Sequence, residues 1–233
     1  MVLNERQLQS FQRDGYLAPI RVLDTDAAEQ IRRRFDELEM REGSEKAQIG
    51  LVDRHFDQSF IFEIATHTRI LEAVEQLLDS EVVLLSTHFF CKYGGTEKRV
   101  AWHQDVTYWN LDPPLAITVW YAIDHADREN GCMRVIPGTH RDGIREHGKS
   151  DVAGNLLSVN QEVPITPDEE ARAVNLELKA GEISLHEGRL IHGSLPNQSD
   201  RRRCGLTLRY VPTKVRIGDI GAAGRPWRPV PVR

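Results

Sequence analysis

The spacing of apolar residues changes near residue 81, and this change constrains the fold more than any other feature of the sequence. Before it, apolar residues recur at helical intervals over residues 24–42 and 68–78, and Asp24 or Thr25 is placed to cap the first segment. After it, short strand-like segments follow one another. Helices followed by a run of strands predict an antiparallel barrel or sandwich, mainly β, with the helices packed outside.

The strand-like segments differ in pattern. Residues 117–123 are almost all apolar, as in a buried strand, whereas residues 203–210 alternate polar with apolar side chains. Asn130-Gly131 predicts a hairpin turn that joins residues 117–123 to residues 133–136. The segments expected to form strands begin at residues 82, 117, 133, 174, 183 and 203.

No repeat or low-complexity linker divides the chain, so we expect a single domain over residues 1–233. We expect it to be mainly helical over 1–80 and to have its strand core over 81–212, followed by a tail at 213–233 that is rich in proline and arginine. Residues 139–172 are polar and poorly periodic, which indicates either a surface excursion or a mobile lid.

The composition excludes several classes of function. A net charge of −5 gives no reason to expect a nucleic-acid partner. No stretch approaches the roughly 18 apolar residues of a membrane span, and the polar N-terminus lacks the apolar core of a signal peptide. Cys91, Cys132 and Cys204 lie far apart, which argues against a disulfide framework or a cysteine metal site and favours a cytoplasmic location. The oligomeric state is left open.

One tripeptide pattern has metal-binding chemistry. An H-x-D on a strand places two ligands on one side, and two histidines with one carboxylate leave positions free on an iron ion. The sequence contains four copies, which begin at His55, His103, His125 and His140. Only the copy at His103 has pocket-forming aromatic residues close by, at Trp102, Tyr108 and Trp109. The alternative for this copy is a strand-end histidine beside a solvated aspartate.

Three segments together carry a family resemblance. AWHQDVTYW at 101–109, IPGTHRDG at 136–143 and IHGSLPNQSDRRR at 191–203 resemble the phytanoyl-CoA dioxygenase family of Fe(II)- and 2-oxoglutarate-dependent oxygenases. The resemblance spans about residues 4–212 and leaves the tail without a match. It implies a double-stranded β-helix, a cupin-like jelly-roll core, with the N-terminal helices packed outside.

The resemblance also implies the metal ligands. In the family an H-x-D is followed by a distal H-x-S-x-x-N-x-S, which here begins at His192. His103, Asp105 and His192 are therefore the expected catalytic iron ligands. His186 competes with His192 for the distal position, but the residues that follow His192 match the family, so His186 is expected to support or pack against the site.

The cosubstrate site follows from the same resemblance. The family places an arginine for the distal carboxylate of 2-oxoglutarate at Arg203, and a bidentate guanidinium suits a carboxylate. The alternative is that residues 201–203 form a solvated charge run; Arg201 and Arg202 are expected to stay in water. Ser194 and Trp120 resemble positions that line the same pocket, with turn capping and core packing as their alternative roles.

The function implied is the oxidation of a small molecule with Fe(II), 2-oxoglutarate and O2, most simply hydroxylation of a metabolite or natural-product intermediate with release of succinate and CO2. Asp105 argues against halogenation, in which relatives lack this carboxylate. A cupin-type metal-dependent isomerase and a non-catalytic sensor of iron or 2-oxoglutarate remain alternatives. The candidate substrate contacts, each with a structural role as its alternative, are His88, Lys92, Tyr108, Trp109 and Arg209.

Overall fold

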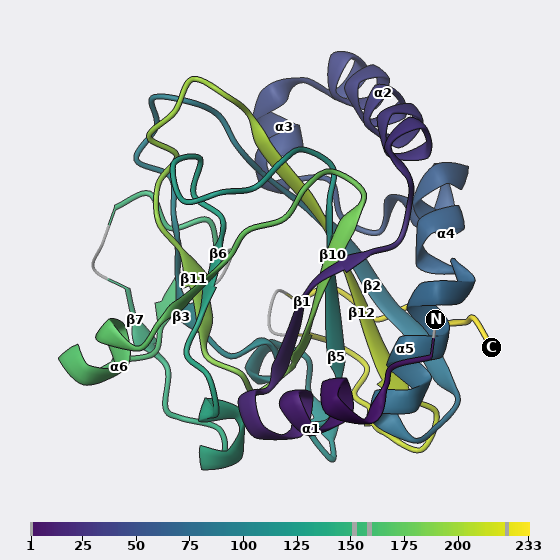
Figure 1. The fold of residues 1–233 in the computed structure, drawn as a ribbon, viewed down its shortest axis with the longest axis vertical. Coiled ribbons are helices and arrows are strands. Elements are labelled where there is room, and N and C mark those ends of the chain that lie inside the picture. Colours follow the sequence, from purple (N-terminus) through teal and green to yellow (C-terminus); the bar gives the residue numbers. More distant parts are fainter. Residues whose placement is uncertain (1, 151–152, 158–159, 222–223) are drawn as a thin grey trace.

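The computed structural model describes residues 2–150, 153–157, 160–221 and 224–233. Two antiparallel sheets face each other, and helices cover the outer side of the larger sheet (Figure 1). The helices are α1 (Glu5–Asp14), α2 (Thr25–Glu42), α3 (Ser44–Ile49), α4 (Ser59–Ala65), α5 (Thr68–Leu78) and α6 (Pro167–Ala171), with short 3-10 turns η1 (Arg54–Phe56), η2 (Asp105–Tyr108) and η3 (Thr139–Asp142). The strands are β1 (Tyr16–Arg21), β2 (Val82–Lys92), β3 (Val100–His103), β4 (Leu111–Asp112), β5 (Ile117–Ala122), β6 (Met133–Val135), β7 (Gly148–Lys149), β8 (Gln161–Glu162), β9 (Val174–Leu176), β10 (Glu182–Glu187), β11 (His192–Ser194), β12 (Arg203–Pro212), β13 (Arg216–Ile217) and β14 (Val230–Pro231).

The two helices expected from apolar spacing are present. α2 begins after Asp24, whose side chain accepts a hydrogen bond of 2.9 Å from the backbone N–H of Ala27, and α5 covers the predicted residues. The apolar stripe of α2 is buried in the core that the helices share with the larger sheet. In this core Phe35 of α2 meets Phe89 of β2, with ring centroids 4.7 Å apart. Helix amphipathicity therefore fixes the outer layer of the fold.

The larger sheet has the strand order β1-β10-β5-β12-β2-β14, with antiparallel pairing throughout. In β12, the side chains at positions 204, 206, 208 and 210 enter the core with the helices. Those of Arg203, Thr207 and Arg209 point to the opposite face and line a cavity. The alternation predicted from the sequence therefore separates the structural face of this strand from its functional face.

The smaller sheet, β3-β11-β6-β9, shows that the predicted hairpin is wrong. β5 is already paired on both edges, with β10 and β12, and β6 pairs with β9 and β11. Asn130 and Gly131 do form a turn: Asn130 exchanges hydrogen bonds with Asp127, and Gly131 has a φ of +76°. The turn leads the chain from one sheet to the other. A turn motif does not determine which strands pair. Here β5 pairs with β10 and β12, and β6 pairs with β9 and β11, all of which lie later in the sequence.

The two sheets form an open jelly roll, which agrees with the predicted fold class. The tail is part of it, because β13 pairs with β4 and β14 pairs with the outer edge of β2. Organisation as a single domain stays a prediction. Within the part of the chain that the structure describes, no helix is long and apolar enough to cross a membrane.

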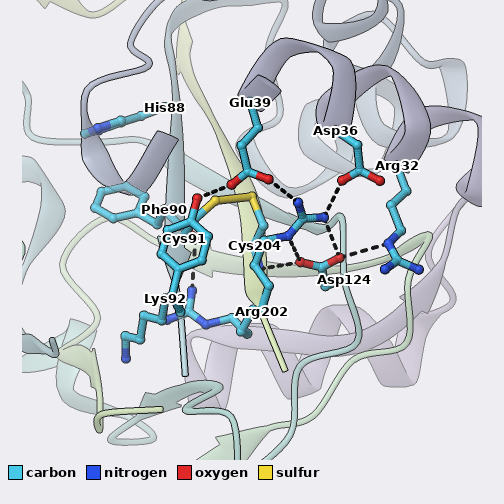
Figure 2. Close-up of a disulfide and its surroundings, with 12 residues drawn as sticks. Arg32, Asp36, Glu39, His88, Phe90, Cys91, Lys92, Asp124, Arg202 and Cys204 are labelled. Atoms are coloured by element: carbon cyan, nitrogen blue, oxygen red, sulfur yellow. Dashed lines mark hydrogen bonds and ion pairs between the residues drawn. A yellow bond between two sulfur atoms is a disulfide. The ribbon is translucent and has the colours of Figure 1, made fainter. Parts of the chain in front are cut away.

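The cysteine spacing argued against a disulfide framework, but the structure contains one disulfide. Cys91 and Cys204 form a disulfide between β2 and β12 (Figure 2). Cys132 is free and buried. The two residues are 113 positions apart in the sequence, but the strand register places them directly opposite each other, with Cα atoms 4.2 Å apart. The spacing of the cysteines in the sequence does not indicate this strand register.

Candidate active site

A cavity of about 800 Å³ opens between the two sheets. Its walls come from the inner faces of β2, β5, β10 and β12 on one side and from β3, β6 and β11 on the other. Residues that follow α3 and residues of the tail complete the lining, with Asn155, Leu156 and Leu157 from the polar 139–172 segment. Segments from the whole length of the chain therefore meet around one space.

His103 and His192 face each other across β3 and β11, where they are paired residues. The Nδ1 of His103 hydrogen-bonds to the carbonyl oxygen of Ala101, and the Nδ1 of His192 hydrogen-bonds to that of Leu190, each at 2.9 Å. A carbonyl oxygen only accepts, so each Nδ1 carries the proton. Both Nε2 atoms are left with a free lone pair, as metal ligands require.

Asp105, at the start of η2, completes the group. Its Oδ1 lies 3.6 Å from the Nε2 of His103 and 3.9 Å from the Nε2 of His192. Its Oδ2 accepts a hydrogen bond of 2.6 Å from Thr118 on β5. One ligand atom from each of the three residues lies within 4.8 Å of the others, and all three residues are buried. Two imidazole nitrogens and one carboxylate oxygen thus converge in the arrangement that non-haem iron prefers.

The ionisation of these groups favours metal binding. Burial alone would raise the pKa of Asp105, but the neighbouring His103 and His186 outweigh it and hold its pKa well below the ordinary value. Burial, with His103 and His186 nearby, holds the pKa of His192 well below its ordinary value. A depressed pKa keeps the aspartate ionised and the imidazole neutral at neutral pH. These are the forms that bind a metal ion.

His186 lies beside the three ligands and outside their converging atoms. Its Nε2 is 3.4 Å from the Oδ2 of Asp105, and its ring centroid is 4.4 Å from that of His192. The expected role of His186 in supporting the site matches this position. The other H-x-D histidines are elsewhere: His55 hydrogen-bonds to Thr87, His140 contacts the carbonyl of Gln12, and His125 is exposed.

Arg203 lies at the start of the cavity face of β12 and is 2 % exposed. Its Nη1 donates to the carbonyl of Phe90 at 3.3 Å, and its guanidinium lies over the ring of Trp120, 5.5 Å from the centroid. Among the described residues its Nε has no hydrogen-bond partner. Burial lowers the pKa of Arg203 to about 10, which leaves it charged at neutral pH. A buried, charged guanidinium with unused donors needs an anion from outside the chain.

Ser194 also lines the cavity, but Lys92 lies behind it. The Nζ of Lys92 donates to the Oγ of Ser194 at 2.5 Å and to the carbonyl oxygens of Leu195 and Gly131. Burial, with Arg203 nearby, lowers the pKa of Lys92 well below its ordinary value. The structure therefore places Lys92 in a set of internal hydrogen bonds outside the cavity lining, unlike the other candidate substrate contacts.

Arg202 is not in water, contrary to expectation. It forms ion pairs with Asp36 and Glu39 of α2 and with Asp124, which follows β5 (Figure 2). Arg201 is more exposed and pairs with acidic residues at the surface. A run of three arginines looked uniformly polar in the sequence, but the strand that begins at Arg203 turns its neighbour toward the helix layer. These ion pairs anchor the start of β12 next to Arg203.

Gly205 gives Trp120 the space that it needs beside Arg203. A Cβ at position 205 would lie 1.9 Å from Cζ2 of Trp120. We expect Gly205→Ala to displace the indole and to lower the free energy of unfolding by about 1–3 kcal/mol, as overpacking in cores does. Thermal unfolding together with 2-oxoglutarate affinity would measure both effects. Unchanged values for both would show that Trp120 does not need this space.

The remaining candidate substrate contacts, His88, Tyr108, Trp109 and Arg209, all line the cavity. The Nε2 of His88 donates to the carbonyl of Ile49 at 2.6 Å, and burial lowers the pKa of His88 to about 3. His88 is therefore neutral at neutral pH. Burial raises the pKa of Tyr108, so its hydroxyl stays protonated.

Three residues of the site were not predicted. Thr118 fixes Asp105, and buried Gln104 donates to the carbonyls of Gly143 and Arg189, which holds the backbone between two ligands. Trp227 in the tail lines the cavity and donates to the carbonyl of Trp109 at 3.1 Å. Its position in a proline-rich tail gave no signal, since only the folded chain brings residue 227 to the cavity.

The fold and the site define the class: a jelly roll that presents two histidines and one carboxylate to a metal ion. Within that class, the model of the family described as phytanoyl-CoA dioxygenase (PhyH) matches residues 11–205. The chain belongs to this family. The resemblance predicted from three sequence segments is thereby confirmed.

Curated relatives support the same family. The chain is 32% identical over 132 residues to phytanoyl-CoA dioxygenase 1 of Oryza sativa subsp. japonica, covering 57% of this chain and 45% of that protein. It is 27% identical over 181 residues to the peroxisomal phytanoyl-CoA dioxygenase of Bos taurus, covering 76% of this chain and 53% of that protein. The chain spans about half the length of the curated relatives it matches.

Solved structures confirm the fold class. The non-heme monooxygenase ThoJ, in its apo form, is 29% identical with a TM-score of 0.77, covering 92% of this chain and 82% of that one. CytC3 with Fe(II) and alpha-ketoglutarate is 26% identical with a TM-score of 0.68, covering 93% and 80%. EctD from S. alaskensis, at 20% identity and a TM-score of 0.76 over 93% and 78%, is similar in fold. The His-Asp-His group and the cofactors named for CytC3 agree with the prediction of iron and 2-oxoglutarate.

Proposed function

We propose that this protein is an Fe(II)- and 2-oxoglutarate-dependent dioxygenase that hydroxylates a small-molecule metabolite or natural-product intermediate, with release of succinate and CO2. One observation carries the proposal: His103, Asp105 and His192 direct three ligand atoms to one point of the same cavity that holds the buried, anion-seeking Arg203. The family and the CytC3 neighbour support it.

The donor set fits the proposed cofactors. The two Nε2 atoms and the Oδ1 of Asp105 would hold Fe(II), because both Nδ1 atoms are committed to backbone carbonyls. Arg203 would bind the distal carboxylate of 2-oxoglutarate, with Ser194 beside it. When bound, iron and 2-oxoglutarate together supply the oxidising power for the reaction with O2.

The protein's own contribution is geometry and exclusion of water. Thr118 keeps Asp105 turned toward the histidines through the hydrogen bond to its Oδ2. Trp120 is 5 % exposed and covers one face of the Arg203 guanidinium, which limits the access of water to the proposed cosubstrate. Limiting the access of water in this way protects a reactive centre from side reactions.

The alternatives fit less well. Asp105 occupies the position that halogenation needs to have open, so we favour hydroxylation. A cupin-type isomerase or other non-oxidative metal enzyme would not require Arg203 to be buried and unpaired. A non-catalytic sensor of iron or 2-oxoglutarate would use the same residues but would not turn over.

The test is anaerobic titration of the protein with Fe(II) and 2-oxoglutarate, followed by the weak visible charge-transfer band of the chelate. We expect the band with 2-oxoglutarate and none with succinate, which lacks the keto oxygen and serves as the matched ligand. A folded, iron-loaded protein that gives no band would contradict the proposal. Succinate formation in the presence of O2 then separates an enzyme from a sensor.

A further inference from the structure

A second buried guanidinium lines the cavity, and nothing proposed above uses it. Arg209 is 9 % exposed, and its Nη1 donates to the Oγ of Ser86 at 3.2 Å. Its Nε has no hydrogen-bond partner among the described residues, and no carboxylate of those residues lies within 4.0 Å of its nitrogens. Arginine stays protonated in proteins. Arg209 is therefore a buried cation with unused donors.

Arg209 is too far from Arg203 to act as part of the same binding site. The two residues are six positions apart on one face of β12, which corresponds to about 20 Å between their backbones. Their aromatic partners also differ: Arg203 lies over Trp120, whereas Arg209 lies over Trp109, 5.3 Å from its ring centroid. The five-carbon chain of 2-oxoglutarate cannot serve both guanidiniums. Arg209 thus belongs to the part of the cavity left for the substrate.

The charges of the cavity indicate the sign of that substrate. Of the three guanidiniums in the lining, those of Arg203 and Arg209 are buried, whereas that of Arg225 is exposed to solvent. The distal carboxylate of 2-oxoglutarate would occupy Arg203, which leaves Arg209 as the buried guanidinium of the lining that is available to the substrate. The ionisable lining residues other than histidine and tyrosine are Asp53, Asp105, Arg203, Arg209 and Arg225. An anionic group on the substrate would meet the unused donors of Arg209, and a planar carboxylate matches the fork of its guanidinium.

The surroundings of Arg209 complete the binding surface. Trp109 and Trp227 offer flat apolar surface, and the buried hydroxyl of Tyr108 has no hydrogen-bond partner among the described residues. A planar guanidinium binds a carboxylate through two parallel hydrogen bonds. The aromatic rings would contact an apolar body attached to that carboxylate.

We propose that Arg209 anchors the carboxylate of a small substrate, whose apolar body lies against Trp109 and Trp227. The inference rests on the proposed oxygenase function for its chemistry, but the anchor itself is a binding site in the protein alone. Arg203 and Arg209 then hold cosubstrate and substrate at different positions along one strand, and Arg209 is paired with Thr118, which hydrogen-bonds to the metal ligand Asp105.

The first test measures binding without iron. A set of small aryl and alkyl carboxylic acids, each paired with its neutral primary amide, is titrated while tryptophan fluorescence is recorded, because Trp109 stacks on Arg209. We expect the acids to bind better than their amides. We expect Arg209→Gln to weaken acid binding by at least about 30-fold, the lower end for loss of a buried charge partner.

Variants and a second measurement keep the outcome clear. Arg209→Lys keeps the charge and should lose less affinity than Arg209→Gln, and Arg216→Gln, at an exposed tail arginine, should change nothing. In the iron-loaded protein, Arg209→Gln should leave the 2-oxoglutarate affinity within two-fold. Equal binding of acids and amides, or a large loss of 2-oxoglutarate affinity in Arg209→Gln, would overturn the anchor. Selective acid binding without succinate formation would instead contradict the oxygenase function and leave the anchor standing.

Discussion

His192→Ala is expected to abolish tight iron binding and to lower turnover by more than about 100-fold. Loss of a group that merely orients a metal ligand costs about 10- to 100-fold, so loss of the ligand itself should cost more. His192 is also buried opposite His103, and alanine would remove one of the three converging ligand atoms. Metal content after dialysis and succinate formation at saturating 2-oxoglutarate would measure the two effects.

His125→Ala is the matched control for this variant. His125 begins another H-x-D, but it is exposed, and its Nδ1 only accepts a hydrogen bond from the backbone of Ala180. The His125→Ala variant should retain both iron binding and turnover. If His192→Ala bound iron as tightly as the unaltered protein, His186 would be the ligand in its place, since its Nε2 already lies 3.4 Å from Asp105.

Local patterns in the sequence predicted the elements of this fold well. The helical spacing of residues 24–42 and 68–78 gave α2 and α5, because an amphipathic helix needs only its own residues to show which face is buried. The alternation in β12 showed which side chains share a face. It placed Arg203 and Thr207 together, and the structure brings both to the cavity.

Pairing between distant segments could not be predicted in the same way. β5 and β6 lie close in the sequence but belong to different sheets, and Cys91 meets Cys204 only through the register of β2 and β12. Strand partners depend on the free energy of the whole sheet rather than on the turn between two strands. The same limit hid Trp227, whose indole reaches the cavity and donates a hydrogen bond to the carbonyl of Trp109, 118 positions earlier in the sequence.

The metal site could be predicted only in part from the sequence. Four H-x-D copies made the tripeptide uninformative by itself; the neighbouring aromatic residues favoured the copy at His103, and the resemblance to a family supported it and joined it to His192. The structure adds contacts that neither the tripeptide nor the resemblance could predict. The backbone carbonyls of Ala101 and Leu190 fix the protons on the Nδ1 atoms of the two histidine ligands, and Thr118 hydrogen-bonds to Asp105. None of these partners has a signature in the sequence, because each depends on where the chain folds.

Arg203→Ala is expected to weaken 2-oxoglutarate binding by about 30-fold to several thousand-fold while leaving iron binding unchanged. Removing one member of a buried, hydrogen-bonded charge pair costs about 2–5 kcal/mol, much of it from the charge left unpaired. Arg203 is 2 % exposed and does not touch the metal ligands in any described contact, so the two effects should separate. Anaerobic titration with 2-oxoglutarate at fixed Fe(II) would measure the affinity.

Two variants decide whether the effect is specific to the guanidinium. Arg203→Lys keeps a positive charge but loses the planar fork and the contact with Trp120, so it should recover only part of the affinity. Arg201→Ala alters the same arginine run, but the Arg201 side chain pairs with Asp127 and Glu129 at the surface. The affinity of this variant for 2-oxoglutarate should match that of the unaltered protein. Equal losses in Arg201→Ala and Arg203→Ala would mean that the start of β12 matters only for structure. A normal 2-oxoglutarate affinity in Arg203→Ala would show that another residue binds the distal carboxylate. Arg209 would then be the remaining buried guanidinium of the lining that could bind it.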